Sequence, residues 1–316
     1  MTKNNFEILR SGINTTYQDL GRKNLYHIGI PFSGAMDNRN YLLSNYLVNN
    51  KKNSSTIEFA YQGPLLKFNG KKVCFAITGD VNFNIIKNNS ILEKGKCYQS
   101  YILNNGDQID ILSTNKSVYG YFAVSGGFET KKFGDSCSIN TKAKVGANDG
   151  KLLKKGDKIL ISNFDQNFQV KKLDYTNTKI EQIRVIKGTN FNYFSEQGKN
   201  FFFNSYFKVS KLSDRMGMRL EGKKIENVID TNIKSEGLIK GVIQVPADGN
   251  PIIMLSDHGT IGGYPKIAVV ISADYDKIVQ ITPGSKIKFK EVTLSDSENL
   301  FKIYNLETKN IINRIT

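Results

Sequence analysis

The sequence predicts a mostly β protein with two barrel-like halves and a few short helices. Short runs of β-branched and aromatic residues recur along the 316 residues, separated by Gly, Asn and Asp. A glycine turn that leads into alternating apolar residues occurs three times. Only one segment carries a well-marked helical pattern. These three observations together indicate the fold class.

The expected strands are the runs in which β-branched and aromatic residues dominate between turn residues. They are Phe6–Arg10, Thr56–Phe59, Val73–Thr78, Tyr98–Leu103, Gln108–Leu112, Val118–Val124, Lys158–Ser162, Gln182–Lys187, Val242–Val245, Ile252–Leu255, Ile267–Ile271 and Lys286–Phe289.

The recurring motif begins at Gly106, Gly156 and Gly284 and reads Gly-Asp-Gln-Ile-Asp-Ile, Gly-Asp-Lys-Ile-Leu-Ile and Gly-Ser-Lys-Ile-Lys-Phe. In each copy the fourth and sixth residues are apolar, which is the period expected of a strand with one buried face. Because the motif occurs in both halves of the chain, it favours repeated barrel-like modules.

The predicted helix runs from Asn38 to about Asn49, with Asp37 as its N-cap. Its expected apolar stripe consists of Tyr41, Leu42, Tyr46 and Leu47. A second helix is expected near Asn190 and includes Phe191 and Phe194.

The chain is long enough for two domains with proper cores. Residues 163–178 are polar and have few apolar anchors, so we interpret them as the connection. The predicted domains are therefore residues 1–175 and residues 176–316.

The net charge of +15 comes from 37 Lys and only 7 Arg. The lysines are scattered and the chain is rich in Asn and Ile, so we interpret the charge as a solvated basic surface and expect no nucleic-acid partner. No apolar run is long enough to cross a bilayer and the N-terminus lacks a signal-peptide core, so no membrane partner is expected. Three widely spaced cysteines form neither a zinc pattern nor a disulfide framework, which favours the reducing cytoplasm and predicts no bound metal.

The sequence lacks a phosphate-binding loop, a Gly-x-Ser-x-Gly elbow and a His-Glu-x-x-His motif. Its two histidines are His27, expected in a turn or at the surface, and His258, which we favour as a loop donor over a catalytic base.

The last third of the chain carries the strongest functional signal. Two apolar strands bracket the turn Pro246–Pro251, and the second strand leads into the loop Asp257–Lys266. Rigid strands that present an irregular polar loop are a common way of building a site. Asp257 ends an apolar strand, where burial could raise its pKa, although a role in capping loop amides is slightly favoured. A simple tight turn at Gly262–Pro265 is the alternative interpretation.

Arg215 and Arg219 lie within five residues in a chain where arginine is scarce. Arginine binds carboxylate or phosphate with a planar, bidentate geometry that lysine does not offer. The two arginines therefore predict either anion recognition or structural ion pairs, Asp214–Arg215 or Arg219–Glu221, with equal weight.

Several motifs occur in an order that resembles the family of the C subunit of bacterial 5-oxoprolinase. The motifs are Thr15-Thr-Tyr-Gln-Asp-Leu-Gly-Arg22, Gly29-Ile-Pro-Phe-Ser-Gly-Ala-Met-Asp37, Ser213-Asp-Arg-Met-Gly-Met-Arg-Leu-Glu-Gly222, Gly241-Val-Ile-Gln-Val-Pro246 and Gly262-Gly-Tyr-Pro-Lys-Ile267. The family is also called KipA or allophanate hydrolase subunit 2, and it is similar to half of the carboxyltransferase domain of urea amidolyase.

The resemblance implies two cyclophilin-like β-barrel domains and a role in ATP-dependent hydrolysis of 5-oxoproline to L-glutamate. The implied partners are the KipI-like B subunit and the A subunit of 5-oxoprolinase, without which the chain is expected to be inactive, and ATP is the implied co-substrate. One alternative is a biotin-dependent carboxyltransferase subunit of the urea carboxylase or allophanate type. Another is a regulatory protein that antagonises a KipI-like kinase inhibitor.

The loop departs from the family pattern. The family usually has Asp-Arg-Gln-Thr-Thr-Gly-Gly-Tyr-Pro in the loop, whereas this chain has His258-Gly259 in place of the Arg-Gln pair. If those side chains bind substrate, the specificity of this protein is expected to differ.

Opening the lactam of 5-oxoproline requires an amide made electrophilic, for which ATP can phosphorylate the amide oxygen. Such a site needs donors for oxyanion charge and cations for phosphate. We therefore expect catalytic roles for Asp257, Lys266 and Arg215. The expected substrate-binding residues are Ser33, Gly34, Asp37, Asp214, Arg219, Gln244, His258, Thr260, Gly262, Gly263, Tyr264 and Pro265. The segments Ser33–Asp37, Asp214–Arg219 and Asp257–Lys266 are predicted to meet at one cleft, with an open face of the Arg215 guanidinium or an Arg215–Asp214 pair.

Overall fold

The computed structural model describes residues 3–87, 90–163, 168–176, 178, 180 and 182–316. The chain forms two compact units rather than two consecutive halves. Unit 1 comprises Met1–Lys23, Ser33–Asn177 and Thr308–Thr316, and unit 2 comprises Asn24–Phe32 and Thr178–Glu307. Two short segments thus belong to a unit other than that of their sequence neighbours.

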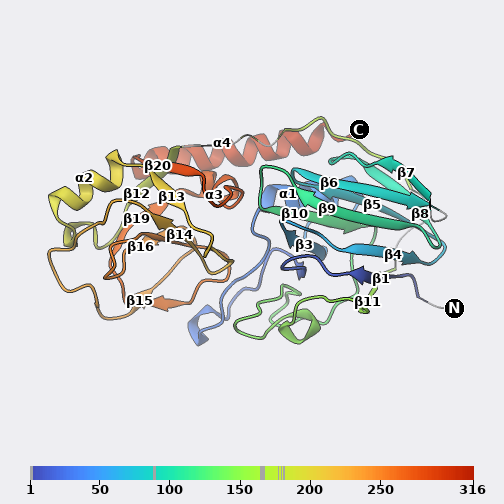
Figure 1. Ribbon diagram of the computed structural model, residues 1–316, viewed down its shortest axis with the longest axis horizontal. Coiled ribbons are helices and arrows are strands. Elements are labelled where there is room, and N and C mark those ends of the chain that lie inside the picture. The colour runs from blue at the N-terminus through green and yellow to red at the C-terminus, as the bar shows by residue number, and fades with distance from the viewer. Residues whose placement is uncertain (1–2, 88–89, 164–167, 177, 179, 181) are drawn as a thin grey trace. The chain divides into compact units, whose positions relative to one another are not determined.

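Unit 1 consists of two antiparallel sheets, one of six strands in the order β11-β1-β4-β9-β6-β7 and one of five in the order β2-β3-β10-β5-β8 (Figure 1). The strands are β1 (Asn5–Arg10), β2 (Thr16–Gln18), β3 (Thr56–Ala60), β4 (Leu65–Asn69), β5 (Lys72–Thr78), β6 (Val81–Lys87), β7 (Ser90–Lys94), β8 (Ser100–Asn104), β9 (Gln108–Thr114), β10 (Tyr119–Val124) and β11 (Lys158–Leu160). The unit also holds helix α1 (Asn38–Leu47) and the 3₁₀ turn η2 (Ala147–Gly150).

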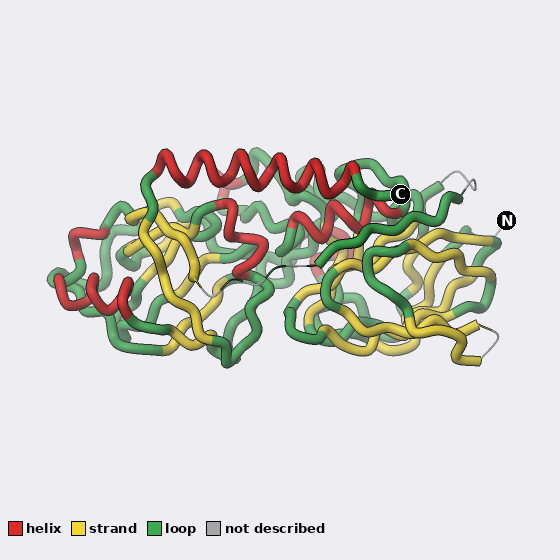
Figure 2. Tube along the Cα trace, turned by 90° about the horizontal axis from the view of Figure 1, so that it is seen from above, coloured by secondary structure: helices red, strands yellow, loops and turns green. Residues whose placement is uncertain are grey.

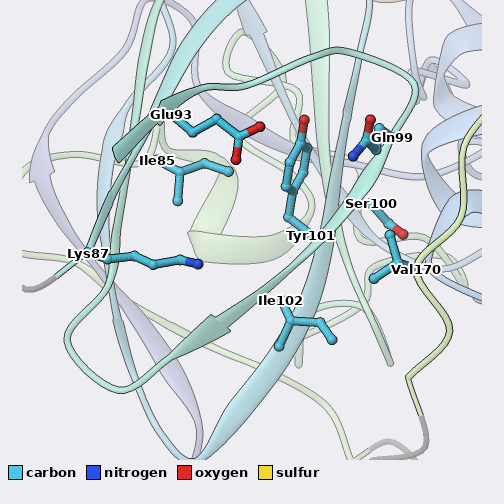
Figure 3. Close-up of a pocket in the computed structure, with 8 residues that line it drawn as sticks. All are labelled: Ile85, Lys87, Glu93, Gln99, Ser100, Tyr101, Ile102 and Val170. Atoms are coloured by element: carbon cyan, nitrogen blue, oxygen red, sulfur yellow. The ribbon is translucent and has the colours of Figure 1, made fainter. Parts of the chain in front are cut away.

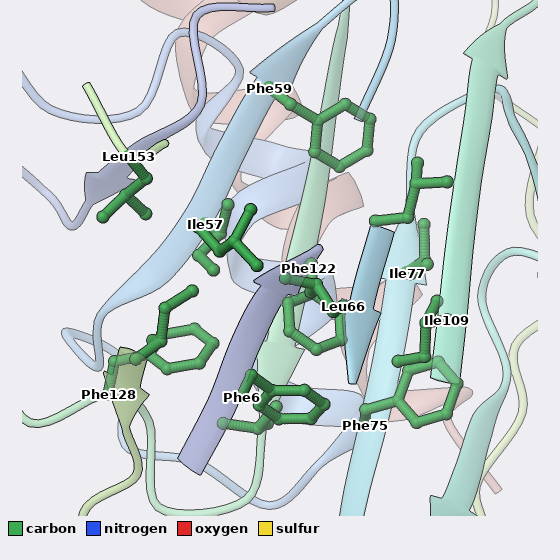
Figure 4. Close-up of a cluster of buried hydrophobic side chains, with 14 of the residues drawn as sticks. Phe6, Ile57, Phe59, Leu66, Phe75, Ile77, Ile109, Phe122, Phe128 and Leu153 are labelled. Carbon is green, nitrogen blue, oxygen red and sulfur yellow. The ribbon is translucent and has the colours of Figure 1, made fainter. Parts of the chain in front are cut away.

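The core of unit 1 lies between these two sheets (Figure 4). Phe6 of β1 meets Phe122 of β10 edge to face, with ring centroids 5.3 Å apart. Both rings are fully buried, as are Leu66 and Ile109 of one sheet and Phe75 of the other. The alternating apolar residues of the strands therefore form a single packed layer.

Each predicted glycine turn is present. Gly106, Gly156 and Gly284 have φ of 88°, 90° and 90°, a backbone conformation that side chains disfavour. They precede strands β9, β11 and β20, and the apolar positions of those strands are buried. The mostly β fold is confirmed, and the motif is confirmed as a turn that starts a half-buried strand.

Helix α1 is confirmed with Asp37 as its N-cap, because the Asp37 carboxylate accepts the amide of Asn40 at 2.9 Å. The helix packs against β5 and β10. Its expected stripe was partly wrong, because Leu43 is fully buried while Leu42 and Tyr46 are only half-buried. The helix is enclosed on most sides, so polar residues such as Ser44 and Asn45 are buried as well.

Unit 2 is a closed seven-stranded barrel in the order β12-β19-β16-β17-β14-β13-β20 (Figure 1). Its strands are β12 (Gln182–Lys187), β13 (Phe207–Val209), β14 (Gly217–Glu221), β16 (Val242–Gln244), β17 (Ile252–Met254), β19 (Lys266–Val270) and β20 (Lys286–Glu291). The remaining elements are a small two-stranded sheet of β15 (Glu236–Gly237) and β18 (Ile261–Gly262), helices α2 (Glu196–Asn204) and α3 (Ser272–Ile278), and the 3₁₀ turns η1 (Tyr26–Ile28) and η3 (Phe191–Tyr193). The β12–β20 pair is parallel and closes an otherwise antiparallel barrel.

The twenty-residue helix α4 (Leu294–Asn313) is absent from the predicted elements (Figure 2). The sequence nevertheless contains a local start signal for this helix. The Asp296 amide donates to Thr293 Oγ1 at 3.1 Å, and the Thr293 amide donates to Asp296 Oδ2 at 3.3 Å. This Thr-x-x-Asp arrangement is a capping box, which marks the beginning of a helix. The second predicted helix begins later than expected, as the short turn η3 followed by α2.

The predicted connection between the halves falls partly outside the described residues. Its described residues 168–176 belong to unit 1, and Leu173 is buried in a cluster with Leu43 and Cys74. The change from unit 1 to unit 2 falls at the end of this segment, between residues 177 and 178. Over the described part of the chain, no helix combines the length and apolar character needed to cross a membrane.

Candidate functional site

Polar residues lie at the ends of the barrel strands in unit 2. Two of them, Arg215 and Asp257, form a buried ion pair. Arg215 Nε donates to Asp257 Oδ2 at 2.7 Å, and Arg215 Nη2 donates to Asp257 Oδ1 at 3.1 Å. Both side chains are less than one tenth exposed. The backbone joins them too, because the Asp257 amide donates to the Arg215 carbonyl at 2.9 Å. The planar fork of arginine is thus matched to a carboxylate of the chain itself.

This geometry corrects two expectations from the sequence. Arg215 is paired with Asp257 rather than with Asp214, which is exposed and accepts the amides of Met216 and Gly217. Asp257 serves as the counterion of Arg215 rather than mainly as a cap for loop amides. The pairing required the register of β14 with β17, which brings Gly217 opposite Met254.

His258 follows Asp257 and is almost fully buried. Its Nδ1 lies 2.6 Å from the Gly259 carbonyl, and its ring meets the edge of Tyr26 at 6.0 Å. Tyr26 in turn stacks on Phe32, with ring centroids 4.6 Å apart. Burial lowers the pKa of His258, so the ring is neutral at pH 7. His258, one of the residues that depart from the family pattern, therefore packs against the segment Asn24–Phe32.

Lys266 begins strand β19 at the far end of the same loop. Its side chain is one twentieth exposed, and its ammonium donates to Glu236 Oε2 at 2.7 Å. The hydrogen bond from Lys266 lowers the pKa of Glu236. Asn190 holds the backbone of Lys266 from the other side, since its Oδ1 accepts the Lys266 amide at 3.1 Å.

The glycine pair of the loop packs against the chain's own residues 233–238, which we call the flap. Gly262 pairs with Glu236 in the β15–β18 sheet, and the Ile233 amide donates to the Gly263 carbonyl at 2.9 Å. A Cβ on Gly262 would lie 2.7 Å from Gln244 Nε2, and a Cβ on Gly263 would lie 3.1 Å from the Ile233 carbonyl oxygen. The two glycines therefore allow the loop to lie close to the flap and to the Gln244 side chain.

The remaining predicted residues of the loop differ in exposure. Gln244 is buried and donates to the Tyr264 carbonyl at 3.1 Å, while the Tyr264 side chain itself is exposed. Thr260 is half-buried and its carbonyl accepts the Leu238 amide at 3.0 Å, and Pro265 is buried. Arg219 lies on β14 with an exposed side chain.

The strand register separates the two ion pairs of unit 2. Lys266 lies opposite Gln244, which lies opposite Ile252 at the start of β17. Asp257 comes three residues after the other end of β17. A three-residue strand spans about 10 Å, so Lys266 and the Arg215–Asp257 pair lie toward opposite ends of these strands. The structure brings Arg215 to Asp257 and Lys266 to Gln244, and it does not gather all four at one point.

The segment Ser33–Asp37 lies in unit 1, where its polar groups have partners. Asn140 Nδ2 donates to Ser33 Oγ at 3.1 Å, and Ser33 has a left-handed φ of 55°. A Cβ on Gly34 would lie 2.9 Å from the Gly21 amide, so this glycine is needed for packing. The Asp37 amide donates to Tyr121 Oη at 2.7 Å. That this segment joins the others at one cleft stays a prediction.

A pocket of about 520 Å³ opens in unit 1 between the edge strands β7 and β8 (Figure 3). The ring of Tyr101 lies between Glu93 and Gln99 in this view. Its hydroxyl accepts the Lys96 amide at 2.8 Å. No residue predicted as part of the site lines this pocket.

Sequence reasoning missed Glu236 and Tyr26 as members of the unit 2 site. Glu236 carries a weak signal, because it is a carboxylate between Ser235 and Gly237, a few residues before an apolar strand. Tyr26 carries none, since it lies 232 positions before His258 and is placed only by the tertiary fold.

Comparison with known protein families and relatives adds to this geometry. The profile of the family described as "Carboxyltransferase domain, subdomain A and B" matches residues 28–291. The chain is 31% identical over 295 residues to the C subunit of 5-oxoprolinase from Escherichia coli (strain K12), covering 92% of both chains. It is 27% identical over 327 residues to urea amidolyase of Saccharomyces cerevisiae, covering 96% of this chain and 18% of that protein.

Solved structures are similar as well. The crystal structure of the Kluyveromyces lactis urea carboxylase matches all of this chain and 31% of its own, with a TM-score of 0.89 at 25% identity.

Proposed function

We propose, from the premise that this chain belongs to the carboxyltransferase domain family of subdomains A and B, that it is the C subunit of an ATP-dependent 5-oxoprolinase. The complex would hydrolyse 5-oxoproline to L-glutamate together with an A subunit and a KipI-like B subunit. One observation carries the proposal: 31% identity to the C subunit of a 5-oxoprolinase, extending over 92% of both chains.

The buried ammonium of Lys266 is the group in unit 2 best suited to an anionic ligand. A cation at the end of a barrel strand, shielded from water, interacts more strongly with a carboxylate or phosphate than a surface lysine does. In the proposed reaction ATP supplies the phosphoryl group that makes the lactam carbonyl electrophilic. Lys266 would hold an oxyanion of the substrate or of the phosphate and stabilise negative charge there.

The Arg215–Asp257 pair supports this site from a distance. Because the fork of Arg215 is bonded to Asp257, the pair fixes the start of β14 to the end of β17, where the loop begins. We propose a positioning role for both residues. The positive and negative charges of the pair cancel, so the pair would act on the ligand only by fixing where the loop begins.

A second candidate is a biotin-dependent carboxyltransferase subunit. It is favoured by the similarity to the urea carboxylase structure, which extends over the whole chain with a TM-score of 0.89. Biotin would take part only in this alternative. Lys266 could hold the carboxylate of a carboxylated donor as well as it could hold a phosphate, so the residues alone do not separate the two chemistries.

Reconstitution tests the proposal. The chain is co-expressed with the products of its neighbouring genes, and the purified complex is assayed for ADP and glutamate release that depends on 5-oxoproline. We expect activity from the complex and none from the isolated chain. Carboxyl transfer from carboxybiotin without release of glutamate would replace the proposal with its alternative.

A matched pair of lysine variants ties the activity to the site. Lys266→Met is expected to lower kcat/KM about 10²-fold, because a charge that stabilises an oxyanion is lost. Lys187 is in the same barrel, and its side chain is half exposed. The substitution Lys187→Met should therefore leave kcat/KM unchanged. Equal effects of the two substitutions would contradict a role for Lys266.

A further inference from the structure

The Lys266–Glu236 ion pair joins two elements of very different stability. Lys266 is on β19, which is hydrogen-bonded to β12 and β16 inside the closed barrel. Glu236 is on β15, a two-residue strand whose neighbour in its sheet is the equally short β18. The lysine side chain is 5% exposed, whereas the glutamate side chain is 45% exposed. The cation is therefore fixed and its partner lies on the surface.

The flap has the features of an element that opens. Of its residues 233–238, only Leu238 is buried, in a small cluster with Val242 and Met254. Backbone hydrogen bonds join the flap to the loop. The Ile233 amide donates to the Gly263 carbonyl at 2.9 Å, and the Leu238 amide donates to the Thr260 carbonyl at 3.0 Å. Segments with few buried apolar contacts and exposed backbone bonds open at low free-energy cost.

The flap also covers the part of the loop that is rich in glycine. Glu236 lies opposite Gly262 and Gly237 opposite Ile261, so the backbone of these loop residues is paired with the flap while it is closed. Opening would release the Lys266 ammonium and the loop backbone together. Both are groups that recognise oxyanions.

We infer that the carboxylate of Glu236 stands in for an oxyanion of the ligand, and that ligand binding displaces it and the flap from Lys266. The oxyanion is either the carboxylate of a small acid or a phosphate of a nucleotide. The inference rests on the proposed function in taking Lys266 as the binding group. The glutamate keeps a buried cation neutralised while the site is empty, since an uncompensated buried charge is costly.

If Glu236 competes with the ligand, removing its charge should tighten anion binding. Removing a residue that binds the ligand would instead weaken anion binding. Glu236→Gln keeps the shape of the side chain but removes its charge. The closed state is then weakened, and a larger fraction of molecules is competent to bind. We expect the dissociation constant for the anion to fall about 3- to 10-fold, as for the loss of a partly exposed ion pair.

The experiment is an NMR titration of the isolated full chain, which needs neither partner subunits nor turnover. Inorganic phosphate and L-5-oxoproline are added separately, and shifts of the amides of residues 233–238 and 260–266 report binding. Tighter binding of phosphate alone would identify a nucleotide subsite, and tighter binding of 5-oxoproline alone would identify the substrate carboxylate. Hydrogen exchange of the Ile233 and Leu238 amides should accelerate when the anion is bound, because their bonds to the loop are broken.

Glu291→Gln is the matched control, since Glu291 is 46% exposed and pairs with Lys187 of the same barrel at 3.0 Å. It should leave the dissociation constant unchanged, and Lys266→Met should abolish binding in a chain whose far-ultraviolet spectrum is native. Unchanged or weaker binding by Glu236→Gln overturns the inference, as does the absence of binding in both the wild type and this variant. If Glu236→Gln fails this test while the complex still releases glutamate, the proposed function stands without the displacement of the flap. If Glu236→Gln binds the anion more tightly but the complex releases no glutamate, the displacement of the flap stands and the proposed function is overturned.

Discussion

Arg215 and Asp257 show how one residue pair can be structural and still shape a site. The pair is bidentate and nearly buried, so Arg215→Lys keeps the charge but loses one of two hydrogen bonds. We expect this substitution to lower the free energy of unfolding by about 1–2 kcal/mol, and Asp257→Asn by about 3 kcal/mol, because the latter removes the buried carboxylate that binds both nitrogens of the Arg215 fork. Urea denaturation measures both.

The matching control is Lys187→Arg at the exposed pair with Glu291. It should change stability by less than about 0.5 kcal/mol, as exposed ion pairs contribute little. An Arg215→Lys variant as stable as the wild type would show that the second hydrogen bond is dispensable.

His258 predicts a pH dependence of stability. Its pKa in the folded chain is lowered by burial, so the unfolded chain binds a proton more readily. The stabilising contribution is complete above the unfolded pKa of about 6.5 and is lost as the pH falls below that value. The slope for one proton is at most about 1.4 kcal/mol per pH unit.

Unfolding by urea between pH 7 and pH 5 measures this slope. We expect His258→Asn to reduce this slope, because the substitution removes the buried ring whose pKa is lowered. An equal slope in wild type and His258→Asn would contradict a neutral buried histidine.

At the scale of elements, the flap and the glycine loop stabilise each other. Gly263 does not have a left-handed φ, so the cost of a side chain there comes from contact, not from backbone strain. A Cβ at 3.1 Å from the Ile233 carbonyl oxygen pushes the flap outward. Gly263→Val is therefore expected to speed hydrogen exchange of the Ile233 amide several-fold and to lower stability by about 1 kcal/mol.

Gly237→Ala is the control on the flap itself, because a Cβ there has no atom within 4 Å. Exchange of the Ile233 amide should be unchanged in this variant. If both variants behave alike, the flap is loosened by any change and not by the specific contact.

For the whole molecule, the net charge of +15 is expected to attract anionic ligands over a longer range than any single contact. Raising the ionic strength from about 50 to about 300 mM should weaken phosphate binding roughly 2- to 5-fold, since the charges are screened. The factor should be similar for the wild type and Glu236→Gln, because the substitution is local. NMR titration with phosphate at both ionic strengths measures this change in affinity. A phosphate affinity that does not depend on salt would contradict long-range attraction by the net charge of the chain.

Much of the fold was readable from local patterns. The strand that begins near Lys286 follows from Gly284 and from the buried positions Ile287 and Phe289. The cap at Asp37 follows from its place before the helix. Helix α4 also has a local signal, because Thr293 and Asp296 have the spacing of a capping box. This pattern could have predicted the start of the helix.

The mostly β character, the turns at Gly106, Gly156 and Gly284, the cap of α1 and the family motifs could all be predicted from local sequence, because each depends on residues a few positions apart. Which carboxylate pairs with each cation could be learned only from the folded chain. Arg215 bonds Asp257, 42 positions away, and Lys266 bonds Glu236, 30 positions away. Strand register and barrel closure set such contacts, and they depend on the packing of the whole unit rather than on any local pattern.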